Sequence, residues 1–215
     1  MEKKNAFLSF FKDHKSLIIF GVLMLVFRSS FADWSDVPTG SMKPTILEGD
    51  RITINKMAYD IRIPLSHISL IKIADPARGD IIVFDSHAAD KRLVKRVIGL
   101  PGDTIAMTNN QLFINGSAIT YENTSETSDK LEHLTGANHQ IRISNINTSF
   151  ASFTNVIVPD DHYLVLGDNR DNSADSRVIG FVPRNEIVGR SRGVMVSLDY
   201  DNYYLPRSER FFHRL

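Results

Sequence analysis

The hydrophobic and polar positions of this chain follow two patterns, and the change between them falls near residue 35. Residues 17–27 (LIIFGVLMLVF) are an unbroken apolar run with no polar face, whereas later apolar stretches are short and separated by Gly, Pro, Asn and Asp. A continuous apolar run favours a helix in contact with lipid, and short β-branched stretches between turn residues favour strands. The pattern predicts one N-terminal helix followed by a mostly β region.

The apolar run is short for a membrane-spanning helix. Its 11 residues would reach about 16 Å at about 1.5 Å per residue, whereas a bilayer's hydrocarbon core is about 30 Å thick. If the Arg28 side chain reaches the headgroup region, the helix can continue to Trp34 at the interface. We therefore expect a transmembrane anchor over residues 17–34, with a length of about 27 Å.

Basic residues lie before this run and set its expected orientation. They are Lys3, Lys4, Lys12 and Lys15. The positive-inside rule then predicts a short cytoplasmic N-terminus at residues 1–16 and an extracytoplasmic domain at residues 35–215. A cleaved secretory signal is an alternative, since Ser30-Phe31-Ala32 has the small-x-small form of a cleavage site. A buried helix of a soluble protein fits less well, because the run has no polar face.

The region after residue 35 has the composition of an antiparallel β domain. Strands are predicted at residues 51–54, 80–84, 93–98, 111–114, 153–158, 163–166 and 187–190. Turn sequences such as Pro101-Gly102-Asp103 and Asn115-Gly116 separate several of them. Residues 120–147 are more polar, and we interpret them as an insertion that decorates the core.

Charge and cysteine content narrow the function. The chain has 25 Lys and Arg against 25 Asp and Glu, and it has no Cys. A balanced charge makes nucleic acid a poor candidate partner, because phosphates are held by clustered basic residues. Without cysteine there is no disulfide, zinc-thiolate site or cysteine nucleophile. Covalent catalysis would have to use an oxygen or nitrogen nucleophile.

Two residues have the setting of a nucleophile and its base. Ser41 lies between Gly40 and Pro44, where a turn can present its hydroxyl outside a strand. Lys95 lies in an apolar predicted strand, where burial would disfavour the ammonium form. Lowering its pKa from about 10.4 to about 7 requires about 4.6 kcal/mol, which is within the range that burial supplies. A neutral amine could then take the Ser41 proton.

Other basic residues fit the role of the base less well. Arg96 does not deprotonate in proteins. Lys43 is nearer to Ser41 in sequence, but nothing in its turn segment would desolvate it. The seven histidines form no H-E-x-x-H motif and none neighbours a serine in a recognisable motif. A Ser-His-Asp triad stays open as a residual alternative.

A polar segment, GDNRDNSADSR at residues 167–177, directly follows the predicted strand 163–166. A calcium loop starting at Asp171 would need Gly at position 176 and Glu at position 182, where the chain has Ser176 and Val182. We interpret the segment as a hydrogen-bonded loop in which Asp175 and Arg177 are spaced to form an ion pair.

Five segments, in order, carry a family resemblance: PTGSMKPT, GDRITINK, RGDIIVF, KRVIGLPGD and GDNRDNSADSR, within residues 37–177. They resemble the type I signal peptidases, membrane-anchored serine-lysine endopeptidases. The resemblance implies that Ser41 is the nucleophile and Lys95 the general base. It also implies that Ser173 hydrogen-bonds the lysine amine, and that Asp175 and Arg177 form a supporting ion pair. The oxyanion hole would combine the Ser41 backbone N–H with the side chain of Thr39, where some relatives carry Ser.

By the same resemblance, the chain would remove N-terminal signal peptides from exported preproteins at the outer face of the bacterial cytoplasmic membrane. It would cut after a small-x-small sequence and bind the substrate as an added β-strand. The expected partners are preproteins and the lipid bilayer, without nucleic acid, cofactor or metal, and the expected state is a monomer. Two alternatives stay open: a specialised processing peptidase of a conjugation, pilus or organellar system, and a catalytically inactive membrane-tethered binding protein.

The C-terminal segment combines aromatic and basic side chains. They are Tyr203, Tyr204, Phe211 and Phe212 with Arg207, Arg210 and Arg214. Aromatic and basic residues together favour a membrane surface. A packed terminal strand with a solvated basic edge is the alternative interpretation.

Overall fold

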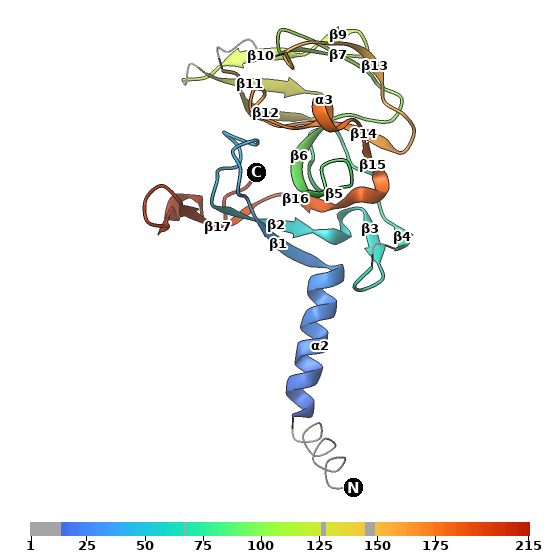
Figure 1. Cartoon of the computed structure of the whole chain (residues 1–215), viewed down its shortest axis with the longest axis vertical. Helices are drawn as coiled ribbons and strands as arrows, with labels where there is room; N and C mark the ends of the chain where they lie inside the picture. Colours follow the sequence, from blue (N-terminus) through green and yellow to red (C-terminus); the bar gives the residue numbers. More distant parts are fainter. Residues whose placement is uncertain (1–13, 67, 126–127, 145–148) are drawn as a thin grey trace.

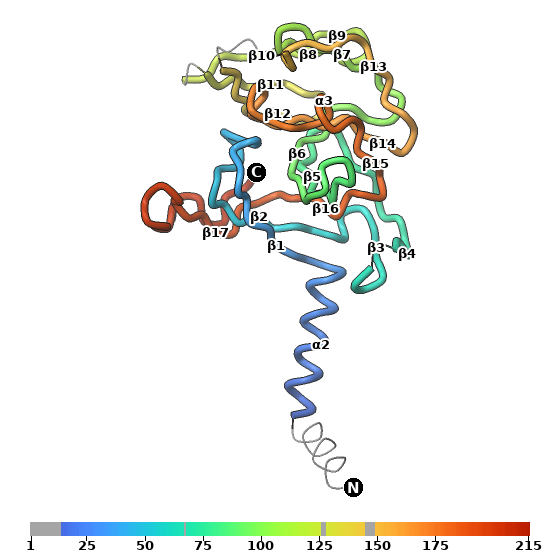
Figure 2. The backbone as a smooth tube through the Cα atoms, viewed as in Figure 1, coloured from blue at the N-terminus to red at the C-terminus, as the bar shows by residue number. Residues whose placement is uncertain are grey.

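Antiparallel strands make up most of the regular secondary structure in a computed structural model that describes residues 14–66, 68–125, 128–144 and 149–215 (Figure 1). The strands form one large sheet, two smaller ones and a two-stranded ribbon. The fold-class prediction of a mostly antiparallel β domain is therefore confirmed. Figure 2 shows that the chain leaves the helix α2 at one end of the β region and that the β10–β12 sheet lies at the opposite end.

The N-terminal helix α2 (Lys15–Ser30) is followed at once by strand β1 (Ala32–Asp36). β1 pairs with β2 (Asp50–Asn55), which places Trp34 opposite Thr53 in a sheet. The prediction that the helix continues to Trp34 is therefore wrong. The physical reason is that the edge of β2 offers these residues backbone hydrogen bonds. Within the described ranges, we find no helix with both the length and the apolar character needed to cross a bilayer.

The large sheet has the strand order β15-β14-β6-β5-β16-β2-β17-β18, with β1 on the side of β2. Its further strands are β5 (Ile81–Ser86), β6 (Lys91–Gly99), β14 (His162–Leu166), β15 (Val182–Pro183), β16 (Ile187–Ser191), β17 (Val194–Asp199) and β18 (Leu205–Pro206). Both faces of its centre are buried: Ile82, Phe84 and Val97 pack in one core cluster, and Ile81 and Val83 pack in another. The continuous apolar runs of the sequence reflect this two-sided burial.

The remaining strands surround this sheet. They are β3 (Asp60–Arg62), β4 (Ser69–Lys72), β7 (Thr104–Thr108), β8 (Gln111–Ile114), β9 (Ser117–Ala118), β10 (Thr120–Asn123), β11 (Asp129–Leu134), β12 (Ala137–Arg142) and β13 (Phe153–Ile157). Short helical turns are α3 (Ser176–Ile179), η1 (Lys56–Ala58), η2 (Arg184–Glu186) and η3 (Ser208–Arg210). All seven predicted strands overlap strands of the structure.

The polar insertion at residues 120–147 does more than decorate the core. Its described residues form the sheet β10-β11-β12, and Leu134 joins the core cluster of Ile98 and Leu164. Glu132 and His139 of this sheet are buried. Polar residues are normally expected at the surface, so the sequence pattern does not reveal that these two side chains face inward. They can be buried because they are paired with other buried polar groups. The segment interpreted as an insertion that decorates the core thus also contributes Leu134 to that core.

The C-terminal segment fits both sequence interpretations in part. Arg210 forms a 2.6 Å ion pair with the buried Asp50, and Arg207 pairs with Asp199 at 3.2 Å. These two basic side chains are held by the protein and follow the packed alternative. Tyr203 and Phe212 are 93% and 80% exposed, so the aromatic residues remain open to a membrane surface.

Candidate active site

Ser41 lies in a turn that joins β1 to β2. The turn is tied to β2 by backbone hydrogen bonds from Val37 to Asp50 (2.9 Å) and from Gly49 to Val37 (3.0 Å). Val37, Met42 and Ile46 bury their side chains in the core below it. These apolar positions fix the path of the turn, and the half-buried Ser41 is left to face an open groove.

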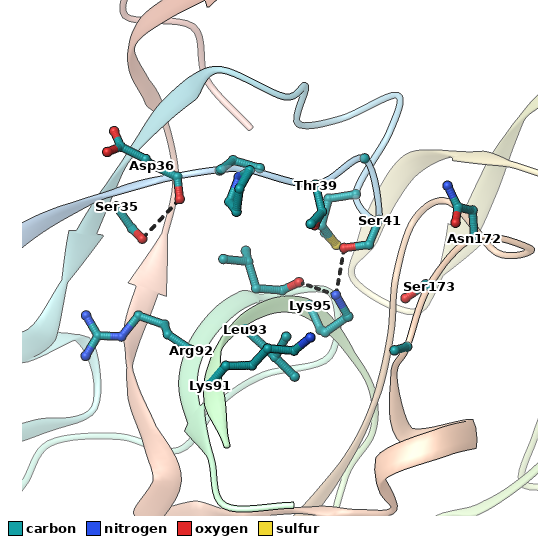
Figure 3. Close-up of a pocket in the computed structure, with 16 residues that line it drawn as sticks. Ser35, Asp36, Thr39, Ser41, Lys91, Arg92, Leu93, Lys95, Asn172 and Ser173 are labelled. Atoms are coloured by element: carbon teal, nitrogen blue, oxygen red, sulfur yellow. Dashed lines mark hydrogen bonds between the residues drawn. The ribbon is translucent and has the colours of Figure 1, made fainter. Parts of the chain in front are cut away.

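Lys95 approaches Ser41 from β6. Its Nζ lies 2.7 Å from Ser41 Oγ and donates a second hydrogen bond of 3.0 Å to the Val94 carbonyl (Figure 3). Lys95 is only 2% exposed, and the residue paired with it on the neighbouring strand β5 is the apolar Ile82. The fold thus brings together two residues that are 54 positions apart in sequence.

Burial lowers the pKa of Lys95 to about 8, even though the nearby charges of Asp175 and Asp168 work in the opposite direction. The direction agrees with the sequence argument, and the shift is smaller than a pKa of about 7 would require. At pH 7 a group with a pKa of about 8 is neutral in roughly one molecule in ten. A neutral amine can accept a proton from the Ser41 hydroxyl.

The neighbouring Arg96 points to the opposite face of β6 and makes a different interaction. Its guanidinium forms two hydrogen bonds with Asp168, of 2.8 and 2.7 Å, and both side chains are buried. Burial works to raise the pKa of Asp168, but the Arg96 charge holds it below its ordinary value. This bidentate pair fixes the start of the 167–177 loop against β6.

The same loop holds the backbone of the serine turn. Asn169 donates its backbone N–H to the Ser41 carbonyl (3.1 Å) and its side-chain amide to the Gly40 carbonyl (2.9 Å). Thr45, four residues beyond Ser41, donates its hydroxyl to Asp168. The loop therefore positions Ser41 through its main chain, while Lys95 contacts its side chain. The sequence analysis did not assign Asn169 this task.

Ser173 lines the same groove as Ser41 and Lys95, but it does not contact the amine as expected. Its Oγ is buried and has no hydrogen-bond partner within the described part of the chain. The Lys95 amine instead donates to Ser41 and Val94. A side chain at Gly167 would place a Cβ 2.2 Å from Ser173 Oγ and 2.5 Å from the Ser41 carbonyl oxygen. Only glycine permits the loop to pass so close to the serine turn.

The ion pair predicted between Asp175 and Arg177 is present. Arg177 forms two hydrogen bonds with the fully buried Asp175, of 2.8 and 2.7 Å. Asp175 also accepts the Gly167 backbone N–H at 2.9 Å, and Arg177 donates to the Arg170 carbonyl at 2.6 Å. The pair therefore closes the loop on itself and fixes the position of Ser173 between its ends.

A buried polar cluster that the sequence analysis missed supports the loop from the β10–β12 sheet. Arg170 pairs with Glu132 at 2.6 Å, and both are almost fully buried. Tyr121 donates its hydroxyl to Glu132 (2.7 Å), and His139 lies 3.2 Å from it. Burial lowers the pKa of His139, which favours its neutral form. No local motif marks Glu132 or His139, because their partners come from distant segments.

Thr39 is exposed at the rim of the groove, and its side chain lies near Ser41 in Figure 3. The Ser41 backbone N–H donates to no other described residue. Both groups are therefore free to donate to a substrate oxygen. Among the described residues, no three His, Asp or Glu side chains are grouped in a way that could hold a metal ion.

The groove has a volume of about 430 Å³. It runs between residues 35–42, which lead through the serine turn, and residues 91–95 of β6, with residues 172–174 at one side. A serine hydroxyl bonded to a buried lysine amine at the floor of an open groove is the arrangement expected of a serine-lysine peptidase.

Comparison with known proteins agrees with this class. Residues 11–196 match the family model for "Signal peptidase, peptidase S26". The chain is 37% identical over 194 residues to signal peptidase I of Pseudomonas aeruginosa, an alignment that covers 81% of this chain and 68% of that one. It is 34% identical over 190 residues to signal peptidase I P of Bacillus subtilis subsp. natto, which covers 86% of this chain and 88% of that one.

Among solved structures, a signal peptidase I from Enterococcus faecalis matches with 30% identity and a TM-score of 0.37, over 55% of this chain and 98% of that one. The sequence matches are sufficient by themselves to assign the family. The chain belongs to the signal peptidase I family, peptidase S26, and is a peptidase that removes signal peptides. The family prediction made from the five sequence segments is confirmed.

Proposed function

We propose that Ser41 is the nucleophile and Lys95 the general base with which this signal peptidase removes signal peptides. The observation that carries the proposal is the 2.7 Å contact between Lys95 Nζ and Ser41 Oγ at a lysine that is 2% exposed. A hydroxyl is a weak nucleophile until a base accepts its proton, and a buried amine can be that base near neutral pH.

The reaction begins when Ser41 Oγ attacks the scissile carbonyl carbon and its proton passes to the neutral Lys95 amine. The Ser41 backbone N–H and the Thr39 hydroxyl donate to the oxyanion that forms. Collapse of the tetrahedral intermediate breaks the peptide bond, and the Lys95 ammonium returns the proton to the leaving amine. Water, deprotonated by the same lysine, then hydrolyses the acyl-enzyme and restores Ser41.

Ser173, Asp175 and Arg177 act as positioning residues in this proposal. Ser173 Oγ has no hydrogen-bond partner among the described residues, and it is available to the Lys95 amine when Ser41 leaves that amine during the reaction. The ion pair of Asp175 and Arg177 keeps the loop that carries Ser173 in place. Its bidentate geometry and burial make it rigid.

The groove suits an extended peptide. Residues 35–40 on one side and residues 91–95 on the other are two backbone rails between which a third strand can lie. We propose that side chains at alternate positions of this strand face shallow pockets, so that small residues at the first and third positions before the cut are accepted. A larger side chain would move the scissile carbonyl away from Ser41.

We propose that α2 is part of a membrane anchor that holds this site at the outer face of the bacterial cytoplasmic membrane. Leu17, Phe20 and Leu23 of α2 are each more than 60% exposed, and the four lysines at positions 3, 4, 12 and 15 favour a cytoplasmic N-terminus. α2 leads directly into β1, whose last residues line the groove. The groove would therefore lie close to the membrane surface.

The test is incubation of the full chain in detergent with a preprotein, followed by mass measurement of the product N-terminus. We expect a cut after a small-x-small sequence in the wild type and in Ser117→Ala, a control at an exposed strand residue, and no cut in Ser41→Ala. Cleavage at other sequences would refute the signal-peptidase specificity. Cleavage by Ser41→Ala would refute the assignment of the nucleophile.

A further inference from the structure

A small polar cavity is lined by residues of α2's last turn and of the β3–β4 hairpin. Its volume is about 170 Å³, and it lies between the end of α2 and the β3–β4 hairpin, which approach each other in Figure 1. The hairpin is attached to the helix there, because the Leu65 backbone N–H donates to Ser29 Oγ. Three basic side chains line the cavity, namely Lys56, Arg62 and Arg92, and none of its described lining residues is acidic.

Two donors in this cavity lack a partner. Ser30 is 6% exposed, and its Oγ is buried without a hydrogen-bond partner among the described residues. Arg62 Nε is also buried and unpartnered, although its Nη2 binds Asp60 and the Ile187 carbonyl. Buried polar groups are nearly always hydrogen-bonded. The two residues that carry these donors line one cavity, and a ligand with acceptor oxygens bound there would supply partners for them.

The basic side chains are held in place by carboxylates outside the cavity. Lys56 pairs with Asp33 at 3.1 Å, Arg62 with Asp60 at 3.0 Å, and Arg92 with Asp85 at 2.7 Å. These pairs fix the three cations and offset much of their charge, so hydrogen bonds rather than a high net charge would hold a ligand there. Such a site favours a singly charged anion with several acceptor oxygens, and a phosphodiester has this chemistry.

Apolar side chains beside the cavity indicate that the phosphodiester belongs to a lipid. Leu65 lines the cavity and is 80% exposed, and Ile68 on the same hairpin is 61% exposed. On α2, Leu23 is 62% exposed about two turns before the cavity. Acyl chains that leave the cavity would cover these surfaces, whereas a soluble phosphate would cover none of them.

We propose that this cavity binds the headgroup phosphate of an anionic phospholipid, whose acyl chains lie along α2 and the hairpin. The inference rests on the membrane placement of α2 proposed above. The bound lipid accepts hydrogen bonds from Ser30 Oγ and Arg62 Nε and joins the hairpin to the helix. Arg92 lines both this cavity and the substrate groove, so the lipid binds beside the groove.

The test is native mass spectrometry of the full chain in detergent with added phosphatidylglycerol or phosphatidylcholine. Arg62→Gln removes the unpartnered donor, and Ser66→Glu adds a negative charge at a half-buried hairpin position that lines the cavity. The matched controls are Arg192→Gln, at an exposed arginine near α2 but outside this cavity, and Ser117→Glu, at an exposed strand residue. Ser66→Glu keeps Arg62 and its hydrogen bonds, but it replaces a hydroxyl that donates to the Ile63 carbonyl (3.0 Å) and accepts the Ile68 N–H (3.2 Å). Circular dichroism and thermal unfolding of both cavity variants therefore check that the hairpin is intact.

We expect the wild type and both controls to retain phosphatidylglycerol in preference to phosphatidylcholine. Both cavity variants should retain at least about tenfold less phosphatidylglycerol than the wild type. Equal retention by the cavity variants and their controls would overturn the proposal. Equal retention of the two lipids, or displacement of phosphatidylglycerol by inorganic phosphate at equal concentration, would do the same.

Two parallel measurements separate this inference from the proposed function. Cleavage of a short peptide in detergent tests the Ser41 and Lys95 chemistry, and we expect all four variants to cleave it within about twofold of the wild type, because none of these positions touches the reacting atoms. Flotation with phosphatidylcholine vesicles tests whether the chain is anchored at all. If the protein floats with vesicles and cleaves the peptide but retains no lipid selectively, only the lipid-site proposal is refuted. If the wild type retains phosphatidylglycerol selectively but does not cleave the peptide, only the catalytic proposal is refuted.

Discussion

The two faces of β6 place neighbouring basic residues in different environments. Lys95 and Arg96 are adjacent and both nearly buried. Lys95 has a hydroxyl and a carbonyl as its hydrogen-bond acceptors, whereas Arg96 has the carboxylate of Asp168. Burial lowers the pKa of a basic group that has no carboxylate at contact distance, because the charged form loses its hydration. A carboxylate partner stabilises the charged form and works in the opposite direction. One face of the strand can therefore perform proton transfer while the other fixes the loop.

The difference also depends on the chemistry of the two residues. A lysine amine becomes neutral within a pH range that cells experience once it is buried, but a guanidinium does not. Exchanging their positions would leave the groove without its proposed base and the Asp168 side without a bidentate donor. The order of Lys95 and Arg96 along the strand thus assigns one function to each face.

The largest expected effect comes from the Lys95 face. Ser41→Ala, Lys95→Ala and Lys95→Arg should each lower kcat/KM for peptide cleavage by about 10³-fold or more, because each removes the nucleophile or a base that can be neutral. The double variant Ser41→Ala/Lys95→Ala should lose no more than either single variant, since both residues act in one step. Lys72→Ala, at an exposed strand position, is the control. Near-normal turnover by Lys95→Ala, with contaminating peptidase excluded, would sink the serine-lysine assignment.

Variants on the Arg96 face of β6 should lower the stability of the fold. Asp168→Ala leaves a buried guanidinium without its carboxylate and should reduce the free energy of unfolding by about 3–5 kcal/mol, measured by denaturant unfolding. Asp85→Ala, which breaks an ion pair with Arg92 that is more than a third exposed on both sides, should cost less than about 1 kcal/mol. If the two losses were equal, burial would not be what makes the Asp168 pair important.

The pH dependence of cleavage is a smaller effect that isolates the lysine. Since burial lowers the pKa of Lys95 to about 8, the neutral fraction rises about tenfold between pH 7 and pH 9. kcat/KM should rise by the same factor, because the neutral amine is the active form. The rise should persist when His139 and the other histidines are replaced one at a time. Loss of the rise in a single histidine variant would indicate a histidine base instead.

The smallest effect should come from the region that touches neither face of β6. A chain that begins at Ala32 keeps all of β1 and should cleave a short peptide at close to the full rate. A chain that begins at Ser35 loses the pairing of Ala32, Asp33 and Trp34 with β2, and we expect it to be less stable in thermal unfolding. Loss of peptide cleavage in a folded chain that begins at Ala32 would show that α2 takes part in catalysis.

The sequence alone determined the local features of this protein. Period-two and continuous apolar patterns located the central strands, because backbone geometry ties side-chain alternation to each strand. Composition placed Lys95 on an apolar strand and Ser41 in a turn, and the order of five motifs gave the family. The pairing of Asp175 with Arg177 could be predicted because the two residues are close in sequence and form one turn.

Only the tertiary structure decided which distant groups meet. The pairing of β1 with β2 ended the helix at Ser30, since a strand edge supplied hydrogen bonds that no local pattern reveals. Glu132 lies in a polar segment, and the fold buries it against Arg170. Ser173 entered the groove without reaching the Lys95 amine. Burial and ion pairing depend on contacts between segments far apart in the chain, and a one-dimensional pattern does not contain them.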